Sequence, residues 1–200
     1  MIGIWCSFYS ISIDYTQKFC LKRNKMSYQK PYKGLKVIDF SQGVAGPYCA
    51  MLLAQQGAEV IKIEPKDGDW ARSLGQEYGE HSAFSVAANL GKKSIVVDLK
   101  NTKSQSILDK IIKQSDIFIE GFRPGVIKRL GYDYERLKKV NSKLIYLSIS
   151  GFGQNGPMSS KPAMDPVLQA FTGFMSENKG PDDIPHRTPV IIFDMATALY

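Results

Sequence analysis

The chain has 200 residues, which fits one large α/β domain or two small ones. It contains 44% hydrophobic and 22% charged residues, as globular proteins do, and no apolar run approaches the ~18 residues of a membrane span. Most of the net charge of +7 lies in residues 1–33, so the rest of the chain shows no clustered basic patch for nucleic acid. We therefore expect neither a membrane protein nor a nucleic-acid-binding protein.

The three cysteines, Cys6, Cys20 and Cys49, show neither metal-ligand spacing nor a disulfide framework. This usage is typical of a reducing compartment and predicts a cytoplasmic protein. His81 and His186 also have no partner at metal-ligand spacing, so we expect no metal site.

The N-terminal segment differs from the rest of the chain. Residues 1–25 have no leading positive charge and no small-residue cleavage site, which argues against a signal peptide. Met26 begins a polar stretch that leads into the first apolar run and could be the natural start. We expect residues 1–33 to be an extension, disordered or upstream of the true start, and the domain to occupy residues 34–200.

From Gly34 onward, short β-rich runs alternate with helical patterns. Strands are predicted at 35–40, 58–64, 94–99, 116–122, 143–150 and 188–193. Helices are predicted from Pro47 to Gly57 and at 104–115, 124–131, 132–140 and 164–175. This alternation predicts an α/β fold, an open and mostly parallel Rossmann-like sheet with helices on both faces. Ligands of such sheets bind beyond the carboxyl ends of the strands, where Gly- and Pro-rich loops gather here.

Residues 151–156, GFGQNG, match the G-x-G-x-x-G pattern of dinucleotide-binding loops and follow a predicted strand. In those loops the third glycine lies in an opening helix that holds the pyrophosphate. Here Pro157 and Pro162 follow and oppose a helix. We therefore expect no NAD site.

Two aspartates stand at predicted junctions. Asp194 follows the predicted strand 188–193 and precedes a helix, so a helix N-cap is the simpler interpretation. A carboxylate at a strand's end, facing glycine-rich loops, could also be a nucleophile. Asp165 precedes Pro166, where capping again competes with a supporting electrostatic role. Basic residues near loop ends are surface charges singly but together suit a polyphosphate; they are Arg72, Lys100, Arg123 and Arg129.

The order of these motifs is specific. VIDFSQGVAGPYCA, GDWAR, KKSIVVDLK, EGFRPGVIKRLGYDYERL, SISGFGQNGP and RTPVIIFDMATALY follow one another between about Gly34 and Tyr200. Together they resemble the family III CoA-transferases, a group that includes formyl-CoA:oxalate and carnitine CoA-transferases and also α-methylacyl-CoA racemase. The resemblance implies coenzyme A as co-substrate, with neither metal nor NAD.

The resemblance also implies roles for single residues. Asp194 matches the catalytic aspartate of the family, and Asp165 matches an acidic position beside it. The positions that match CoA-contacting residues are Val44, Ala45, Arg72, Val97, Lys100, Gly121, Phe122, Arg123 and Arg129. The implied reaction moves CoA from an acyl-CoA to a carboxylic acid through an aspartyl anhydride.

Two departures from the family pattern bear on the reaction. The racemase branch has a histidine where Met164 stands, and methionine cannot abstract a proton, which favours transfer over racemisation or epimerisation. Oxalate-using members have a glutamine where Val44 aligns, so this loop gives oxalate no support.

Length is a third departure. Family members are about twice as long and form interlocked homodimers. The chain therefore resembles the N-terminal half of the family, part of the large domain, and a non-catalytic CoA-binding remnant is an alternative.

Overall fold

A computed structural model describes residues 30–200, and Pro31–Tyr200 form one compact unit. Most of the expected extension, residues 1–33, lies outside the described residues. Residues 31–34 form a turn before the first strand. Tyr32 is already tied to the fold, because its N–H donates to the carbonyl oxygen of Gln56 at 3.1 Å.

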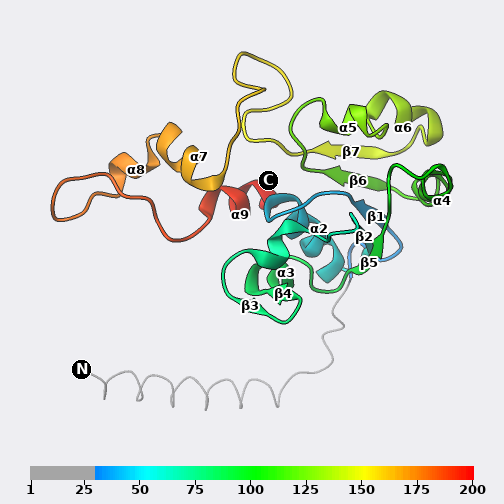
Figure 1. The fold of residues 1–200 in the computed structure, drawn as a ribbon, viewed down its shortest axis with the longest axis horizontal. Coiled ribbons are helices and arrows are strands. Elements are labelled where there is room, and N and C mark those ends of the chain that lie inside the picture. The colour runs from blue at the N-terminus through cyan, green and yellow to red at the C-terminus, as the bar shows by residue number, and fades with distance from the viewer. Residues whose placement is uncertain (1–29) are drawn as a thin grey trace, which may run out of the picture. The chain divides into compact units, whose positions relative to one another are not determined.

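A five-stranded sheet lies at the centre of this unit, in the order β5-β2-β1-β6-β7, and every neighbouring pair is parallel (Figure 1). The strands are β1 (Lys36–Asp39), β2 (Glu59–Glu64), β5 (Lys93–Val96), β6 (Ile117–Glu120) and β7 (Ile145–Ser148). The predicted parallel α/β sheet is thus confirmed. Five of the six predicted strands are present, each shorter than its apolar run.

The sheet has a core on each face because side chains of a strand alternate in direction. Val37 of β1 packs with Ala50 of α2 on one face, whereas its neighbour Ile38 faces the other. There Phe118 of β6, together with Ile38, packs against Leu108 of α4. All five side chains are almost completely buried. Helices therefore cover both faces, as expected.

The helices that cover the sheet are α2 (Ala45–Gln55), α4 (Thr102–Ile112), α5 (Val126–Arg129) and α6 (Tyr134–Val140). α2 begins two residues before Pro47, which lies in the first turn, where a missing N–H leaves no hydrogen bond unmade. Within residues 30–200, no helix is both long and apolar enough to cross a bilayer.

The segment between β2 and β5 holds elements that the sequence did not predict. They are a 3-10 helix, η1 (Trp70–Ser73), a small hairpin of β3 (Glu77–Tyr78) and β4 (His81–Ser82), and α3 (Ala83–Ala87). Each is too short to show a hydrophobic period. Ser82 and Ser85 form a capping box at the start of α3, and this local hydrogen bonding defines the helix.

The C-terminal part corrects two predictions. The predicted helix 164–175 is two helices, α7 (Asp165–Phe171) and α8 (Phe174–Glu177), because Gly173 between them has a φ of 81°. The predicted strand 188–193 was wrong. Residues 188–191 are irregular, and Ile192 begins α9 (Ile192–Leu199).

Side chains explain why no strand forms at 188–193. The backbone N–H of Thr188 and the carbonyl of Val190 bond to the side chain of Gln169. The N–H of Phe193 donates to the carboxylate of Asp165. The groups that would join a sheet are therefore used by α7 instead, a tertiary effect that an apolar run does not reveal.

Candidate active site

Three neighbouring strands end in a buried carboxylate. Asp39, Glu64 and Glu120 are the last residues of β1, β2 and β6 and are 0%, 3% and 1% exposed. Each accepts a hydrogen bond from the backbone of the loop that follows its strand. The donors are the N–H groups of Ser41 at 3.0 Å, Asp69 at 2.9 Å and Phe122 at 2.8 Å. These hydrogen bonds fix the three loops at the carboxyl edge of the sheet.

Two buried lysines neutralise this edge. Asp39 and Lys62 are register partners on β1 and β2, and their charged atoms lie 3.8 Å apart. Lys92 Nζ lies 2.6 Å from Asp39 Oδ2, and Lys62 Nζ lies 2.8 Å from Asp69 Oδ2. Burial alone raises the pKa of Asp39, but Lys92 and Lys62 outweigh it and lower that pKa. Burial lowers the pKa of Lys92 to about 8, against the attraction of Asp39. The two lysines therefore keep the Asp39 carboxylate ionised.

The buried side chains of Lys62, Lys92 and Asp69 bind the backbone between β1 and the first turn of α2. Lys62 Nζ donates to the carbonyl oxygen of Ser41 at 3.0 Å, and Lys92 Nζ donates to that of Pro47 at 2.7 Å. The N–H of Gly43 donates to Asp69 Oδ1 at 2.9 Å. Residues 41–47 are thus fixed at three points by buried charges, and Val44 and Ala45 lie within this span.

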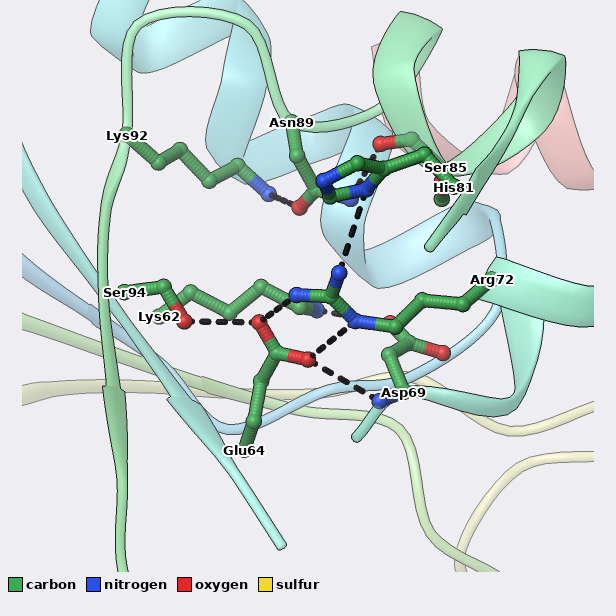
Figure 2. A pocket seen from close by; sticks show the side chains of 9 residues that line it. All are labelled: Lys62, Glu64, Asp69, Arg72, His81, Ser85, Asn89, Lys92 and Ser94. Atoms are coloured by element: carbon green, nitrogen blue, oxygen red, sulfur yellow. Dashed lines mark hydrogen bonds and ion pairs between the residues drawn. The ribbon is translucent and has the colours of Figure 1, made fainter. Parts of the chain in front are cut away.

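Arg72 belongs to the same network (Figure 2). Its Nε and Nη2 form a bidentate pair with the Glu64 carboxylate at 2.9 and 2.8 Å, and its Nη1 lies 3.1 Å from His81 Nδ1. Burial raises the pKa of Glu64, but its hydrogen bonds with Arg72 and Ser94 outweigh burial and lower the value to about 2. The surrounding pocket is only about 180 Å³. Because its polar groups are largely satisfied by one another, we interpret it as a brace rather than a ligand site.

Contacts within the G-D-x-x-R turn, residues 68–72, account for its residue types. Gly68 has a φ of 79°, and a Cβ there would lie 3.0 Å from Cδ of Arg72. Asp69 accepts from the N–H of Ala71 and so caps η1. A Cβ on Gly43 would lie 2.3 Å from Cζ2 of Trp70, so the indole covers that glycine closely. The turn thereby links Arg72 to the 41–47 loop.

A separate cavity of about 430 Å³ opens at the carboxyl ends of β2 and β5. Val97, Lys100 and Phe122, three of the predicted CoA contacts, line it together. Its apolar wall is completed by Phe40, Ile63, Pro65, Leu99 and Leu130, and its polar lining by Gln42, Glu64, Lys66, Asp67 and Asp98. The cavity combines an apolar wall with two exposed lysines at its rim.

The other predicted contacts lie around rather than in this cavity. Val44 is the buried N-cap of α2, and Ala45 is its first residue. A Cβ on Gly121 would lie 3.4 Å from that of Ser41, so the two loops touch. Arg123 and Arg129 are exposed on the loop and helix after β6.

Asp194 and Asp165 form a second cluster. Asp194 lies in the first turn of α9 and makes no side-chain cap, which corrects the N-cap interpretation. Asp165 begins α7 without capping it. Instead, Asp165 Oδ2 accepts from the N–H of Phe193 at 2.6 Å and from that of Asp194 at 3.1 Å. Asp165 thus caps the neighbouring helix.

This arrangement changes the acidity of Asp194. Burial, and then the charge of Asp165, raise the pKa of Asp194 from 3.8 to about 6. Asp165 is 2% exposed and receives two N–H groups plus the amide of Gln169. Asp165 thus has three hydrogen-bond donors, whereas the Asp194 carboxylate accepts no hydrogen bond from the residues that the structure describes.

The structure brings together only some of the residues that the resemblance assigns to CoA contact and catalysis. Phe122 and Lys100 share the cavity, but Asp194 is not among its lining residues. α9 packs against α2, whose N-cap is Val44, so the two regions are joined through α2.

Several site residues were missed from the sequence. Lys66 lines the cavity beside Lys100, and Gln169 holds Asp165. A signal for others was present, because acids end the runs KVID, EVIKIE and IFIE. An ionisable residue that closes an otherwise apolar strand is costly to bury unless it has a partner.

The sequence model of CoA-transferase family III matches residues 32–200. The chain belongs to this family. It is 43% identical over 158 residues to an acetyl-CoA:oxalate CoA-transferase of Acetobacter aceti, covering 78% of this chain and 41% of the relative. It is 36% identical over 180 residues to the human succinyl-CoA:glutarate CoA-transferase, covering 89% and 41%.

Solved structures agree with this family. A CAIB/BAIF family protein from Brucella suis has a TM-score of 0.80 at 35% identity, over 85% of this chain and 46% of that protein. This CoA-transferase family III chain spans less than half the length of these relatives.

Proposed function

We propose that this chain carries the CoA-binding and nucleophilic part of an enzyme that moves coenzyme A between an acyl-CoA and a carboxylic acid. The observation that carries the proposal is the pair of Asp194 and Asp165. Asp165 takes the N–H groups at the start of α9, so Asp194 is a partly buried carboxylate that is not used for capping. A carboxylate kept free in this way suits a nucleophile.

We place the nucleotide end of CoA in the 430 Å³ cavity. Its apolar wall, with Phe40 and Phe122, suits a purine ring, and Lys66 and Lys100 suit phosphates. The exposed Arg123 and Arg129 add positive charge on the neighbouring loop. Arg72 would act indirectly, because its guanidinium is paired with Glu64.

The proposed cycle begins when an Asp194 oxygen attacks the thioester carbonyl. The C–S bond breaks, CoA leaves as thiolate, and an aspartyl anhydride remains. The thiolate then attacks the aspartyl carbonyl, forming an aspartyl-CoA thioester and releasing the donor acid. The acceptor carboxylate attacks this thioester to give a second anhydride and thiolate. Attack of the thiolate on the acceptor's acyl carbon yields the new acyl-CoA and frees Asp194.

The raised pKa of Asp194 suits this chemistry. At a value of about 6 the carboxylate is ionised at neutral pH but more basic than a solvated aspartate. The acceptor is proposed as a small carboxylic acid. Relatives named for oxalate and for glutarate both match the chain, and Val44 gives oxalate no particular support.

Hydroxylamine trapping tests the proposal directly. The purified protein is mixed with acyl-CoA donors and hydroxylamine, and the peptide containing Asp194 is analysed by mass spectrometry. We expect a hydroxamate at Asp194 that requires acyl-CoA, because an activated acyl group on that carboxylate reacts with the amine. A hydroxamate at another carboxylate, with Asp194 unmodified, would contradict the proposal.

A second candidate is a CoA-binding chain without transfer activity. It is favoured by the position of Asp194 outside the lining of the 430 Å³ cavity. CoA binding by calorimetry, with no hydroxamate and no transfer to any acid tested, would support it. Racemisation or epimerisation has less support, because Met164, 62% exposed, offers no proton acceptor beside Asp165.

A further inference from the structure

Gln169 is a buried polar residue that neither the sequence motifs nor the proposed mechanism uses. It lies on α7, one turn after Asp165, and is 1% exposed. A buried amide without partners would be costly, so its surroundings show what it does.

Both the nitrogen and the oxygen of the Gln169 side-chain amide have hydrogen-bond partners, and these partners fit only one orientation of the amide. Its Nε2 donates to Asp165 Oδ1 and, at 3.1 Å, to the carbonyl oxygen of Val190. Its Oε1 accepts from the N–H of Thr188 at 2.9 Å and lies 3.5 Å from Thr188 Oγ1. Turning the amide over would place its oxygen against a carboxylate and a carbonyl, so the network permits one orientation.

These contacts form a hydrogen-bond network that connects the two aspartates. Gln169 holds Oδ1 of Asp165, and this leaves Oδ2 facing the N–H groups of Phe193 and Asp194. Gln169 also fixes Thr188 and Val190, which lead into α9. The side-chain amide of Gln169 therefore holds both Thr188 and Val190, the two ends of the 188–190 segment that precedes α9.

We propose that Gln169 is a positioning residue for Asp194, acting through Asp165 and the 188–190 backbone. The inference rests on the proposed function for its meaning in catalysis, but not for its geometry. Gln169 is not among the residues that line the 430 Å³ cavity, so its role is to orient the carboxylate pair.

The test compares Gln169→Met, Gln169→Glu and the control Gln114→Met in the full chain. Methionine keeps the length and helix propensity of glutamine but lacks the two N–H donors of its side-chain amide. Glutamate keeps an acceptor for Thr188 but meets Asp165 with a second carboxyl group. Gln114 is exposed after α4, among residues at the amino ends of the strands. Two readouts need no turnover: amide exchange at Phe193 and Asp194, and the carboxyl carbon titrations of Asp194 and Asp165.

In Gln169→Met we expect the two amides to exchange about tenfold faster, because the cap of α9 loses its fixed orientation. The Asp194 midpoint should fall by roughly half a unit or more, because the Asp165 charge is no longer held beside it. In Gln169→Glu the introduced carboxyl group, when protonated, still donates to Asp165, so amide protection should be close to normal at low pH. Protection should be lost as that carboxyl group ionises, and Gln114→Met should change neither readout.

Unchanged amide protection and an unchanged Asp194 midpoint in both folded Gln169 variants would overturn the inference. A uniform loss of protection throughout the sheet in both variants would also overturn it, because Gln169 would then act on global stability. CoA binding and hydroxamate formation report separately on the proposed function. The unmodified chain could show neither CoA binding nor hydroxamate formation, while amide exchange and the Asp194 midpoint change as expected in the Gln169 variants. That result would reject transfer and support the positioning role of Gln169.

Discussion

Asp165 and Asp194 have identical side chains in different surroundings. Asp165 is buried with several hydrogen-bond donors, and Asp194 is partly buried beside that negative charge. Burial, and then the like charge of Asp165, oppose the ionisation of Asp194 and raise its pKa to about 6. The difference therefore comes from placement on α7 and α9.

Asp194→Asn separates chemistry from stability. The folded pKa of about 6 lies above the ordinary 3.8, so the stability contribution of this carboxyl is fully present below about pH 3.8 and is lost as pH rises through 6. Asparagine avoids that loss. We expect the variant to melt at a higher temperature than the unmodified chain at neutral pH, with the difference closing in acid. It should form no hydroxamate.

Thermal unfolding across a pH series, with trapping on the same samples, measures both effects. The matched control is Asp182→Asn, because Asp182 is exposed and outside both clusters. An Asp194→Asn variant that still forms the activated acyl group, with deamidation excluded by mass spectrometry, would remove Asp194 from the mechanism.

The loops are organised at the scale of elements by the acids that end β1, β2 and β6. A terminal carboxylate can receive the N–H groups of the turn that follows, which would otherwise lack partners at the edge of the sheet. Lys62 and Lys92 make the burial of Asp39 tolerable, and Arg72 does the same for Glu64. Glu120 accepts hydrogen bonds from Ser148 and from the N–H of Phe122. These loops are thus anchored to the sheet.

Gly43→Ala tests how closely the 41–47 loop is packed. A Cβ there meets Trp70 at 2.3 Å on a backbone with a φ of 83°, so the cost combines overlap with conformational strain. We expect a loss of about 2–4 kcal/mol in the free energy of unfolding. Urea denaturation with a Gly79→Ala control measures it, because Gly79 has a φ of 63° but open space.

The control should lose only about 1 kcal/mol, the cost of strain alone. Adding Trp70→Ala to Gly43→Ala should recover part of the loss. Equal losses in the two glycine variants would show that the indole does not restrict the loop.

The Glu64–Arg72 pair predicts how stability responds to acid. The folded pKa of Glu64, about 2, lies below its ordinary 4.5, so its stabilisation is present above pH 4.5 and is lost as pH falls toward 2. We expect Glu64→Gln to remove up to about 3 kcal/mol at neutral pH and much less at low pH.

Urea midpoints between about pH 2 and 7 measure this dependence, with Asp109→Asn as control. Asp109 pairs with Arg136, but both side chains are about a third exposed, 32% and 36%, so about 1 kcal/mol or less is expected. A Glu64→Gln loss that does not change with pH would indicate that packing, not charge, is removed.

Much of the fold was predictable because its signals are local. The parallel strands and the α4 helix follow from β-rich runs and from an apolar stripe at helical spacing. The 188–193 segment was not predictable, because the side chains of Gln169 and Asp165 take its backbone groups. Likewise, the family motif made Asp194 a candidate catalytic residue. Only the tertiary structure shows that the Asp165 side chain caps the helix that carries Asp194.

At the scale of the whole molecule, we assign two regions to the proposed reaction. One is the cavity between the ends of β2 and β5, and the other is the aspartate pair between α7 and α9. The braced 41–47 loop leads from β1 into α2, and α2 packs against α9. CoA spanning the two regions would carry its thioester from the cavity toward Asp194.

Coenzyme A binding tests that assignment of the cavity. Lys66 and Lys100 line it, whereas Lys110 lines a cavity at the amino ends of the strands. We expect Lys66→Gln and Lys100→Gln each to weaken CoA binding about tenfold, because each removes a cation available to a phosphate. Lys110→Gln, the matched control, should leave the affinity unchanged.

Calorimetric titration at two salt concentrations provides the measurement. The affinity of the unmodified chain should fall as salt rises, and less steeply after either cavity lysine is replaced, because screening acts on exposed charge pairs. Asp194→Asn should bind CoA as the unmodified chain does, since its carboxylate lies outside the cavity lining. Weakening by Lys110→Gln alone would move the nucleotide site to the opposite edge of the sheet and separate it from Asp194.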